Sequence, residues 1–580
     1  MSSDEKTPWP AMSLERATAQ LCAPGARFEL HTVVVDGREI LSWRNQPPTL
    51  SDLAFQARKL HAQKEFIVHQ DERVTYDMWF RAVAALSRAL LSYQVRPGDR
   101  VAIAMRNLPE WPVALFAIAA VGAIAVPLNA WWTGPELTYG LQDSGARLLI
   151  ADAARWSAVR PHLDELPQLE HVWVARPSDA AMPIPAVSLE SIIGAVTDYA
   201  SLPDQNLPAV AIAPESDLSI FYTSGTTGRP KGAVGSHRNM LTCSLSNAFS
   251  QHRSFLRRGL NPLPGTPKTI LLAIPFFHVT GCHSTMISGM LNGNKLVLLP
   301  KWDTRQALGL IERERITTAG GVPALAWQLV EADRGGHDLS SLEIVTYGGA
   351  FAAPELVRRI SSDLDAFPAT GWGMTETSAT FTHHMAEDYL NRPGSCGPAL
   401  PLCALKVVDP ATGEELPVGE VGELYAYGPQ IVRGYWNSPE ATAATFADGW
   451  VRTGDLARLD EEGFCFIVDR IKDIVIRGGE NIYSIEVESA LYDHPAVLDA
   501  AVVGIPHRIL GEEPAAIVQC AAGFRPSESE LQQWVRERLA AFKVPVRILF
   551  CDDPLPRNAN GKILKNCVQE QLAQIRMVPE

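Results

Sequence analysis

Two features are scarce in this sequence: paired cysteines and positive charge. Nine cysteines are scattered from Cys22 to Cys567, an odd number with no Cys-X-X-Cys pair, which argues against a disulfide framework or a cysteine-based metal cluster. The 51 basic residues are outnumbered by 65 acidic ones, so the net charge is -14. This balance does not favour nucleic acid or an anionic membrane surface as the main partner. We expect a cytoplasmic protein with reduced thiols.

The sequence also lacks a recognisable signal or membrane-spanning segment. Its first residues, MSSDEKTPWPAM, are acidic and interrupted by proline, unlike a secretory signal. Residues 111–128 carry no charge, but alanine dominates there and Gly122 and Pro127 interrupt the run. This pattern predicts a buried helix followed by a short buried strand, with no transmembrane segment.

The 580 residues exceed what one hydrophobic core supports, so at least two domains are expected. Between residues 75 and 350, strand-like apolar runs alternate with helical patterns, which predicts α/β architecture with sheets covered on both faces. Short strands and glycine-rich turns follow residue 395 and predict β-hairpins. From residue 473 onward, the pattern predicts a small α+β domain. Ligands of α/β sheets bind at the carboxyl ends of the strands.

A phosphate-binding loop is the first chemical signal. The stretch YTSGTTGRPKG (222–232) follows an apolar strand, DLSIF (217–221), and combines three glycines, several hydroxyls and a lysine. Glycines let backbone N–H groups approach a phosphate, while hydroxyls donate hydrogen bonds and the lysine adds charge. The spacing is not that of a Walker A loop, because Lys231 is three residues after Gly228 and precedes a glycine.

Four further motifs follow this loop: GWGMTET (371–377), VRTGDLARLD (451–460), DRIKDIVIRGGENIYSIEVE (469–488) and PLPRNANGKILK (554–565). In this order, the five motifs resemble those of the adenylate-forming enzymes, which include acyl-CoA synthetases, adenylation domains of peptide synthetases and beetle luciferases. The resemblance runs from about residue 70 to 566. It implies an α/β N-terminal domain with a β-rich subdomain (1–469), a hinge (470–472) and a mobile α+β C-terminal domain (473–580).

The resemblance implies a nucleotide site with Mg²⁺ and ATP. Glu376 would hold Mg²⁺, Thr375 would bind the α-phosphate, and Lys562 would neutralise charge in the transition state. Asp455 and Arg470 would bind the ribose. The remaining positions are those for the β- and γ-phosphates (Thr223, Ser224, Gly225, Thr226, Thr227 and Lys231) and for adenine (Gly349, Ala350, Phe351 and Trp372). Relatives usually carry tyrosine in place of Trp372 and proline in place of Phe351.

The implied mechanism has two steps. The carboxylate of the substrate first attacks the α-phosphorus of ATP, giving an acyl-adenylate and pyrophosphate. The C-terminal domain then rotates about Lys472, and Gly478 and Gly479 leave room for the pantetheine arm of CoA to reach the adenylate.

The acid itself is weakly constrained. Residues matching the acid pocket are mostly apolar and include Phe277, His278, Gly320, Val322 and Tyr347, although His278 would equally suit a core histidine with a satisfied hydrogen bond. Residues 275–281 contain no acidic side chain to pair with a substrate ammonium, so an acid without an α-amine is expected. The motifs GWGMTET and DRIKD, together with the extended segment before residue 70, most resemble those of bacterial medium- or long-chain fatty acyl-CoA synthetases. Aryl, arylalkanoic and steroid side-chain acids remain open alternatives.

The acceptor and the broader class also have alternatives. Only 18 residues follow Lys562, too few for a carrier domain, so CoA is the expected acceptor and a separate carrier protein the alternative. A luciferase-like oxygenase would share the adenylation motifs. A non-enzymatic binding protein would be expected to lack Lys562, Glu376 or Asp455, and all three are present. Both a monomer and a homodimer are compatible with the sequence.

Overall fold

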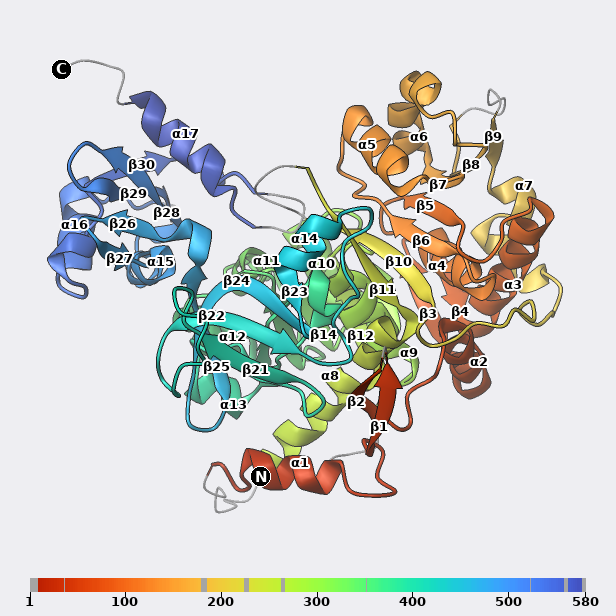
Figure 1. The fold of residues 1–580 in the computed structure, drawn as a ribbon, viewed down its shortest axis with the longest axis horizontal. Coiled ribbons are helices and arrows are strands. Elements are labelled where there is room, and N and C mark those ends of the chain that lie inside the picture. The colour runs from red at the N-terminus through yellow and green to blue at the C-terminus, as the bar shows by residue number, and fades with distance from the viewer. Residues whose placement is uncertain are drawn as a thin grey trace.

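The computed structural model describes residues 9–35, 37–178, 185–223, 229–261, 266–350, 352–521, 523–557 and 562–575 (Figure 1). Two large sheets form the centre of the N-terminal part. Three hydrophobic cores cover their faces: one between the sheets and one on the outer face of each. The arrangement is therefore five layers, helices alternating with sheets, as expected for strands that are buried on both faces.

The first sheet has the strand order β11-β10-β6-β5-β7-β8-β9 and is parallel except for the β10–β11 hairpin. Helices α5 (Gly134–Ser144) and α6 (Ala153–Val159) contribute to the core on its outer face. Its strands are β5 (Arg100–Ala104), β6 (Ile124–Pro127), β7 (Leu148–Asp152), β8 (His171–Ala175), β9 (Ala186–Ser188), β10 (Asp217–Tyr222) and β11 (Gly232–Ser236).

The second sheet has the order β19-β16-β15-β14-β12-β13-β3-β4, with a parallel interior and antiparallel edges. Helices α10 (Thr304–Glu314), α11 (Pro323–Val330) and α12 (Pro354–Leu364) cover its outer face. Its strands are β3 (Glu65–His69), β4 (Glu72–Thr75), β12 (Thr269–Leu272), β13 (Lys295–Leu298), β14 (Thr318–Gly321), β15 (Ile344–Gly348), β16 (Phe367–Gly371) and β19 (His384–Met385).

The uncharged run at 111–128 forms the buried helix and strand predicted from its sequence. Helix α4 (Glu110–Ala120) lies in the core between the sheets with every residue buried, and β6 follows it. A helix that is apolar on all sides needs such an enclosed position. Across the part of the chain that the structure describes, no helix is both long and apolar enough to cross a membrane. Helices α2 (Leu50–His61), α3 (Tyr76–Ser92) and part of α8 (His237–Arg257) share this core.

An N-terminal segment packs on the far end of α8. It consists of α1 (Leu14–Leu21) and the hairpin β1 (Leu30–Val35) and β2 (Arg38–Trp43). Phe28 and Trp43 pack against Phe249 of α8, with ring centroids 5.6 and 5.5 Å from it. This segment therefore supports the helix that later forms one wall of the site.

The region after residue 395 folds as the predicted β-rich subdomain. Its antiparallel sheet has the order β20-β25-β24-β22-β21, with β23 paired to β24. The strands are β20 (Gly397–Pro398), β21 (Ala404–Val408), β22 (Gly422–Tyr427), β23 (Phe446–Ala447), β24 (Trp450–Leu459) and β25 (Phe464–Arg470).

The C-terminal part, blue in Figure 1, has its own sheet and hydrophobic cores. Helices α15 (Ser484–Tyr492), α16 (Glu528–Arg536) and α17 (Lys565–Ile575) pack with strands β26 (Val475–Arg477), β27 (Glu480–Ile482), β28 (Val497–His507), β29 (Gly511–Cys520) and β30 (Arg547–Cys551). The predicted fold class, α/β with a β-rich subdomain and a small α+β C-terminal domain, is confirmed.

Short elements complete the description. Those that approach the site are the π-helix η3 (Thr280–Ile287), the β17 (Gly373–Met374) and β18 (Ala379–Thr380) pair, and the 3-10 turns η4 (Thr375–Thr377) and η5 (Ile471–Asp473). The others are α7 (Glu190–Ile193), α9 (Ser288–Met290), α13 (Glu387–Asn391), α14 (Pro439–Thr445), η1 (Arg160–Glu165), η2 (Val196–Ser201) and η6 (Ala541–Lys543).

Candidate active site

A cavity of about 1760 Å³ lies at the carboxyl ends of strands β14, β15 and β16. The β-rich subdomain and the C-terminal domain contribute to the same cavity, through Arg470 and Lys562. Of the described residues that the sequence singled out, it brings together Thr223, Lys231, His278, Val322, Tyr347, Gly349, Trp372, Thr375, Glu376, Arg470 and Lys562.

Hydrogen bonds join the two ends of the predicted phosphate-binding loop (222–232). The Thr223 N–H donates to the Lys231 carbonyl at 2.8 Å, and the Lys231 N–H donates to Thr223 Oγ1 at 3.3 Å. The β10–β11 hairpin fixes these ends because Tyr222 pairs with Gly232. Ser224, Gly225, Thr226 and Thr227, assigned to this loop from the sequence, lie outside the described residues, as does Phe351.

The glycine pair of GWGM permits a close backbone approach. A Cβ added to Gly373 would lie 1.7 Å from the Ala379 carbonyl oxygen, and one added to Gly371 would lie 2.3 Å from the Thr382 carbonyl oxygen. Only glycine fits at such distances. The tight β17–β18 pair that results presents Trp372, Thr375 and Glu376 to the cavity.

Glu376 is a buried carboxylate with a specific partner. It is 6% exposed, and its Oε1 accepts a hydrogen bond from the Tyr435 hydroxyl at 2.5 Å. Burial raises the pKa of Glu376, while the Tyr435 hydroxyl lowers it. Lys231 Nζ lies 5.1 Å from the centre of the Tyr435 ring. Tyr435 therefore links the buried acid to the loop lysine, a contact that no sequence motif indicated.

Trp372, Asp455 and Arg470 form a second polar group. The Trp372 indole N–H donates to Asp455 Oδ2 at 2.8 Å, and Arg470 Nε lies 3.1 Å from Asp455 Oδ1. Both carboxylate oxygens are thus engaged on a side chain that is almost fully buried. Trp372 and Arg470 line the cavity, whereas Asp455 lies behind them, outside the lining. The sequence predicted a neighbouring placement for these three residues, but not the hydrogen bond from the indole.

Lys562 reaches this cavity from the loop before α17. Burial lowers the pKa of Lys562 to about 7, and the positive charge of Arg470 lowers it further, while Asp473 and Asp455 act in the opposite direction. A polyanion bound in the cavity would raise the pKa of Lys562 and stabilise its charged form.

A buried ionic network holds the start of α17 against the hinge region. Lys565 Nζ lies 2.9 Å from Glu488 Oε1 and also donates to Ser484 Oγ. Asp469, at the end of β25, accepts hydrogen bonds from the Ser484 backbone N–H and hydroxyl. Burial raises the pKa of both Asp469 and Glu488, and the Lys565 ammonium opposes this in each case. The network joins the end of β25 to α15 and to the start of α17, three residues after Lys562.

The sequence left two alternatives for His278, a residue that lines the pocket and a core histidine with a satisfied hydrogen bond, and His278 has features of both. It lines the cavity, and its Nδ1 accepts a hydrogen bond from the Thr280 N–H at 3.3 Å. Burial lowers the pKa of His278 to about 4, so the imidazole is neutral at physiological pH.

Two acid-pocket assignments need correction. Phe277 is 7% exposed and does not line the cavity, because its side chain is buried in the surrounding structure. Gly320 does not line it either: a Cβ there would lie 1.9 Å from the Thr346 carbonyl oxygen, so this glycine serves the close pairing of β14 with β15.

Other predicted residues also lie outside the cavity lining. Ala350 is exposed beside the lining residue Gly349. Lys472 lies in the exposed turn η5 between the two domains. Gly478 and Gly479 form the β26–β27 turn with φ of 61° and 91°, and both are exposed to solvent. In this structure, the cavity therefore contains Lys562 and excludes the glycine turn.

Comparison with known proteins identifies the family. The AMP-binding enzyme model matches residues 53–436, and the AMP-binding enzyme C-terminal domain matches residues 486–562. The chain belongs to the AMP-binding enzyme family. The predicted adenylate-forming relationship is confirmed, and the chain is an ATP-dependent acyl- or aryl-CoA ligase.

Relatives named for different substrates are comparably similar to this chain. A feruloyl-CoA synthase from Amycolatopsis sp. is 35% identical over 508 residues, covering 87% of this chain and 95% of the relative. A long-chain-fatty-acid–CoA ligase from Mycobacterium tuberculosis is 32% identical, covering 86% and 93%. The structure of an anthranilate CoA ligase with anthranoyl-AMP superposes with a TM-score of 0.81 at 27% identity, covering 91% and 98%.

Lys565→Met is expected to destabilise the protein most at neutral pH. Without the ammonium, Asp469 and Glu488 remain as uncompensated buried carboxylates, which typically costs about 3 to 5 kcal/mol. The pKa values of Asp469 and Glu488, already raised in the folded protein, would rise further. A carboxyl whose pKa is higher in the folded state than in the unfolded state lowers the stability of the fold as the pH increases above the unfolded-state pKa. Urea unfolding of the full chain should therefore show a deficit that shrinks in acid.

Lys543→Met is the matched control, since Lys543 pairs with the partly exposed Glu486 at 2.6 Å in the same domain. Its loss should have a small effect with little dependence on pH. Equal unfolding profiles for the two variants would contradict a special role for the Lys565 network.

Proposed function

We propose that this ligase activates a carboxylic acid as an acyl-adenylate and then transfers the acyl group to CoA. The observation that carries the proposal is the meeting of Lys562, from the C-terminal domain, with Lys231 and Glu376 in one cavity. The arrangement supplies cations for the phosphates and a carboxylate for a metal ion. Burial lowers the pKa of Lys562, and bound phosphates would raise it.

The nucleotide would lie between the two polar groups of the cavity. Thr223 and Lys231, with the loop residues 224–227, would bind the β- and γ-phosphates. Asp455 would accept hydrogen bonds from the ribose hydroxyls with help from Arg470, since charge-assisted hydrogen bonds are the stronger ones. Adenine would lie against Trp372 and the turn that contains Gly349, Ala350 and Phe351.

Mg²⁺ fits Glu376 by its chemistry. Mg²⁺ takes oxygen ligands and is commonly held by one or two carboxylates together with substrate phosphates and water. The described residues contain no cluster of three or more metal-binding side chains, so phosphate oxygens would complete the coordination around Glu376. When bound, the ion would supply electrostatic stabilisation of negative charge on the phosphates. Tyr435 would orient the Glu376 carboxylate through its 2.5 Å hydrogen bond.

In the first step, a carboxylate oxygen of the acid attacks the α-phosphorus. A new acyl–phosphate bond forms as the bond from the α-phosphorus to the bridging oxygen breaks, and pyrophosphate leaves with the electron pair. Thr375 would hold the α-phosphate, and Lys562 would stabilise the charge that develops on it. Phosphates near Lys562 would raise its pKa and keep it protonated during this step.

In the second step, the CoA thiolate attacks the acyl carbon and AMP leaves. The C-terminal domain (473–580) would rotate relative to residues 1–469 about the hinge 470–472, with Lys472 at the pivot. Lys562 would leave the cavity as Gly478 and Gly479 enter it. The exposed position of that glycine turn, with Lys562 inside the cavity, corresponds to the orientation needed for adenylation.

Two classes of acid are candidates. One is a medium- or long-chain fatty acid, which the similarity of the sequence motifs to those of fatty acyl-CoA synthetases favours. The other is an aryl, arylalkanoic or steroid side-chain acid. Relatives named for ferulate and for long-chain fatty acids support one class each. A carrier protein in place of CoA is the alternative acceptor. The relative named as a fatty acid–acyl-carrier-protein ligase, 34% identical, supports that alternative.

Lys562→Ala should slow adenylation by roughly 100- to 1000-fold, the usual cost of losing one electrostatic group at a transition state. Thioester formation from supplied acyl-adenylate should be unchanged, because Lys562 would be outside the cavity in that step. Pyrophosphate release and acyl-CoA formation are measured separately. Lys543→Ala, in the same domain but remote from the cavity, is the control, and an equal loss in both half-reactions would contradict the assignment.

Tyr435→Phe should move the acid limb of the adenylation rate to higher pH. The Tyr435 hydroxyl lowers the pKa of Glu376, so its removal would let the buried carboxylate take up a proton at higher pH and lose its charge for Mg²⁺. Pyrophosphate release across the acid-to-neutral range measures this. Tyr427→Phe, whose ring packs on Trp450 in the β-rich subdomain, is the control. An unchanged acid limb would refute the role of Tyr435.

A further inference from the structure

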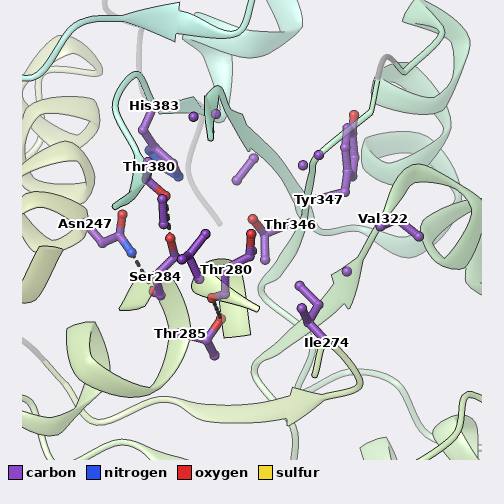
Figure 2. A pocket seen from close by; sticks show the side chains of 18 of the residues that line it. Asn247, Ile274, Thr280, Ser284, Thr285, Val322, Thr346, Tyr347, Thr380 and His383 are labelled. Atoms are coloured by element: carbon purple, nitrogen blue, oxygen red, sulfur yellow. Dashed lines mark hydrogen bonds between the residues drawn. The ribbon is translucent and has the colours of Figure 1, made fainter. Parts of the chain in front are cut away.

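The inner part of the cavity has two unlike walls (Figure 2). One wall comes from α8, η3 and the segment around β18, and it carries uncharged hydrogen-bonding side chains: Asn247, Thr280, Ser284, Thr380 and His383. The opposite wall is apolar and contains Ile274, Val322 and the ring of Tyr347. The hydroxyl of Tyr347 bonds to the Tyr389 hydroxyl at 2.9 Å, so its polar end is already engaged. We call this region the acid chamber.

The polar wall is held in place by internal hydrogen bonds. Asn247 Nδ2 donates to the Ser284 carbonyl at 2.7 Å, and Ser284 Oγ lies 2.7 Å from Thr380 Oγ1. The Thr285 hydroxyl donates to the Thr280 carbonyl at 3.1 Å, within the π-helix η3. Figure 2 shows these three links as dashed lines around the chamber. Such wide helical turns are rare and are frequently found at functional sites.

Three polar side chains of the chamber are placed to meet a ligand. His383 Nδ1 is buried and has no hydrogen-bond partner within the described part of the chain, and Thr280 and Thr346 line the same chamber with their hydroxyl-bearing side chains. Burial lowers the pKa of His383 to about 4, and the nearby charge of Arg253 lowers it further, so the ring is neutral. It offers one donor and one acceptor. An aliphatic chain filling the chamber would leave these groups desolvated and unsatisfied, which is costly.

We propose that the acid chamber selects a ring-containing carboxylic acid that bears hydroxyl or carbonyl oxygens remote from its carboxylate. This inference rests on the proposed adenylation function. The apolar wall would pack one face of the ring system, and the oxygens would hydrogen-bond to Thr280, Thr346 and His383. The polar side chains of the chamber are uncharged, which favours neutral oxygens over a second carboxylate.

The test uses acids that differ by a single oxygen. AMP release with Mg-ATP and CoA is compared for 3-(4-oxocyclohexyl)propanoate against 3-cyclohexylpropanoate, for 3-(4-hydroxyphenyl)propanoate against 3-phenylpropanoate, and for straight-chain acids from nonanoate to palmitate. A site built for hydrogen bonding discriminates against analogues that lack the group. We expect kcat/KM to be at least about tenfold higher for the oxygenated member of a pair.

Each outcome decides a different point. Straight-chain acids preferred over every ring acid would overturn the substrate proposal and leave the ligase function intact. Equal kcat/KM within both ring pairs would overturn the role of the hydroxyls. Failure of every acid to release AMP would overturn the proposed function itself.

Valine variants assign the effect to particular hydroxyls. Thr280→Val and Thr346→Val remove a hydroxyl at nearly constant shape, and each should lower kcat/KM about tenfold for an oxygenated acid while leaving its deoxygenated partner unaffected. Thr138→Val is the control, because the Thr138 hydroxyl bonds only within α5, to the Gly134 carbonyl. Thermal unfolding confirms that each variant folds. Equal loss on both acids of a pair would show that the hydroxyls are structural and overturn the proposal.

Discussion

The desolvation of Lys562 is the constraint on which the rest of the site depends. Its ammonium lies near the guanidinium of Arg470 in a buried cavity, and its pKa falls to about 7 as a result. Such a group is unfavourable unless anions join it, and a triphosphate would supply them. The protein tolerates this arrangement because Lys562 does not stand alone. The start of α17 is secured to α15 and the end of β25 by Lys565, Ser484, Glu488 and Asp469.

Two buried carboxylates at or beside the cavity also have specific partners. Glu376 accepts a hydrogen bond from the Tyr435 hydroxyl, a neutral donor that stabilises the charge of the carboxylate without cancelling it. Asp455 accepts one from the Trp372 indole and pairs with Arg470. Arg470 then joins the Asp455 side of the cavity to the Lys562 side.

Much of this could be predicted from sequence because the chemistry is concentrated in short motifs. Lys231 and Glu376 lie in stretches rich in glycines and hydroxyls, Lys562 follows the asparagine- and glycine-containing stretch NANG, and the alternating apolar runs indicated covered α/β sheets. Tyr435 and the Lys565 network were missed because their partners come from distant segments. Phe277 and Gly320 were expected to line the cavity but do not, because a residue next to a lining residue in the sequence can point its side chain elsewhere. The cavity wall that carries Asn247, Thr280, Ser284, Thr380 and His383 is polar, and no motif indicated it because these residues come from separate segments, including the π-helix at 280–287.

Transfer of oxygen from the acid to the nucleotide tests the central claim most directly. The carboxylic acid is labelled with ¹⁸O in its carboxylate and incubated with the enzyme, Mg-ATP and CoA, and the products are analysed by mass spectrometry. Attack on the α-phosphorus predicts one ¹⁸O in AMP and none in pyrophosphate, with no ADP formed. Appearance of ADP, or of ¹⁸O in phosphate or pyrophosphate, would contradict the account.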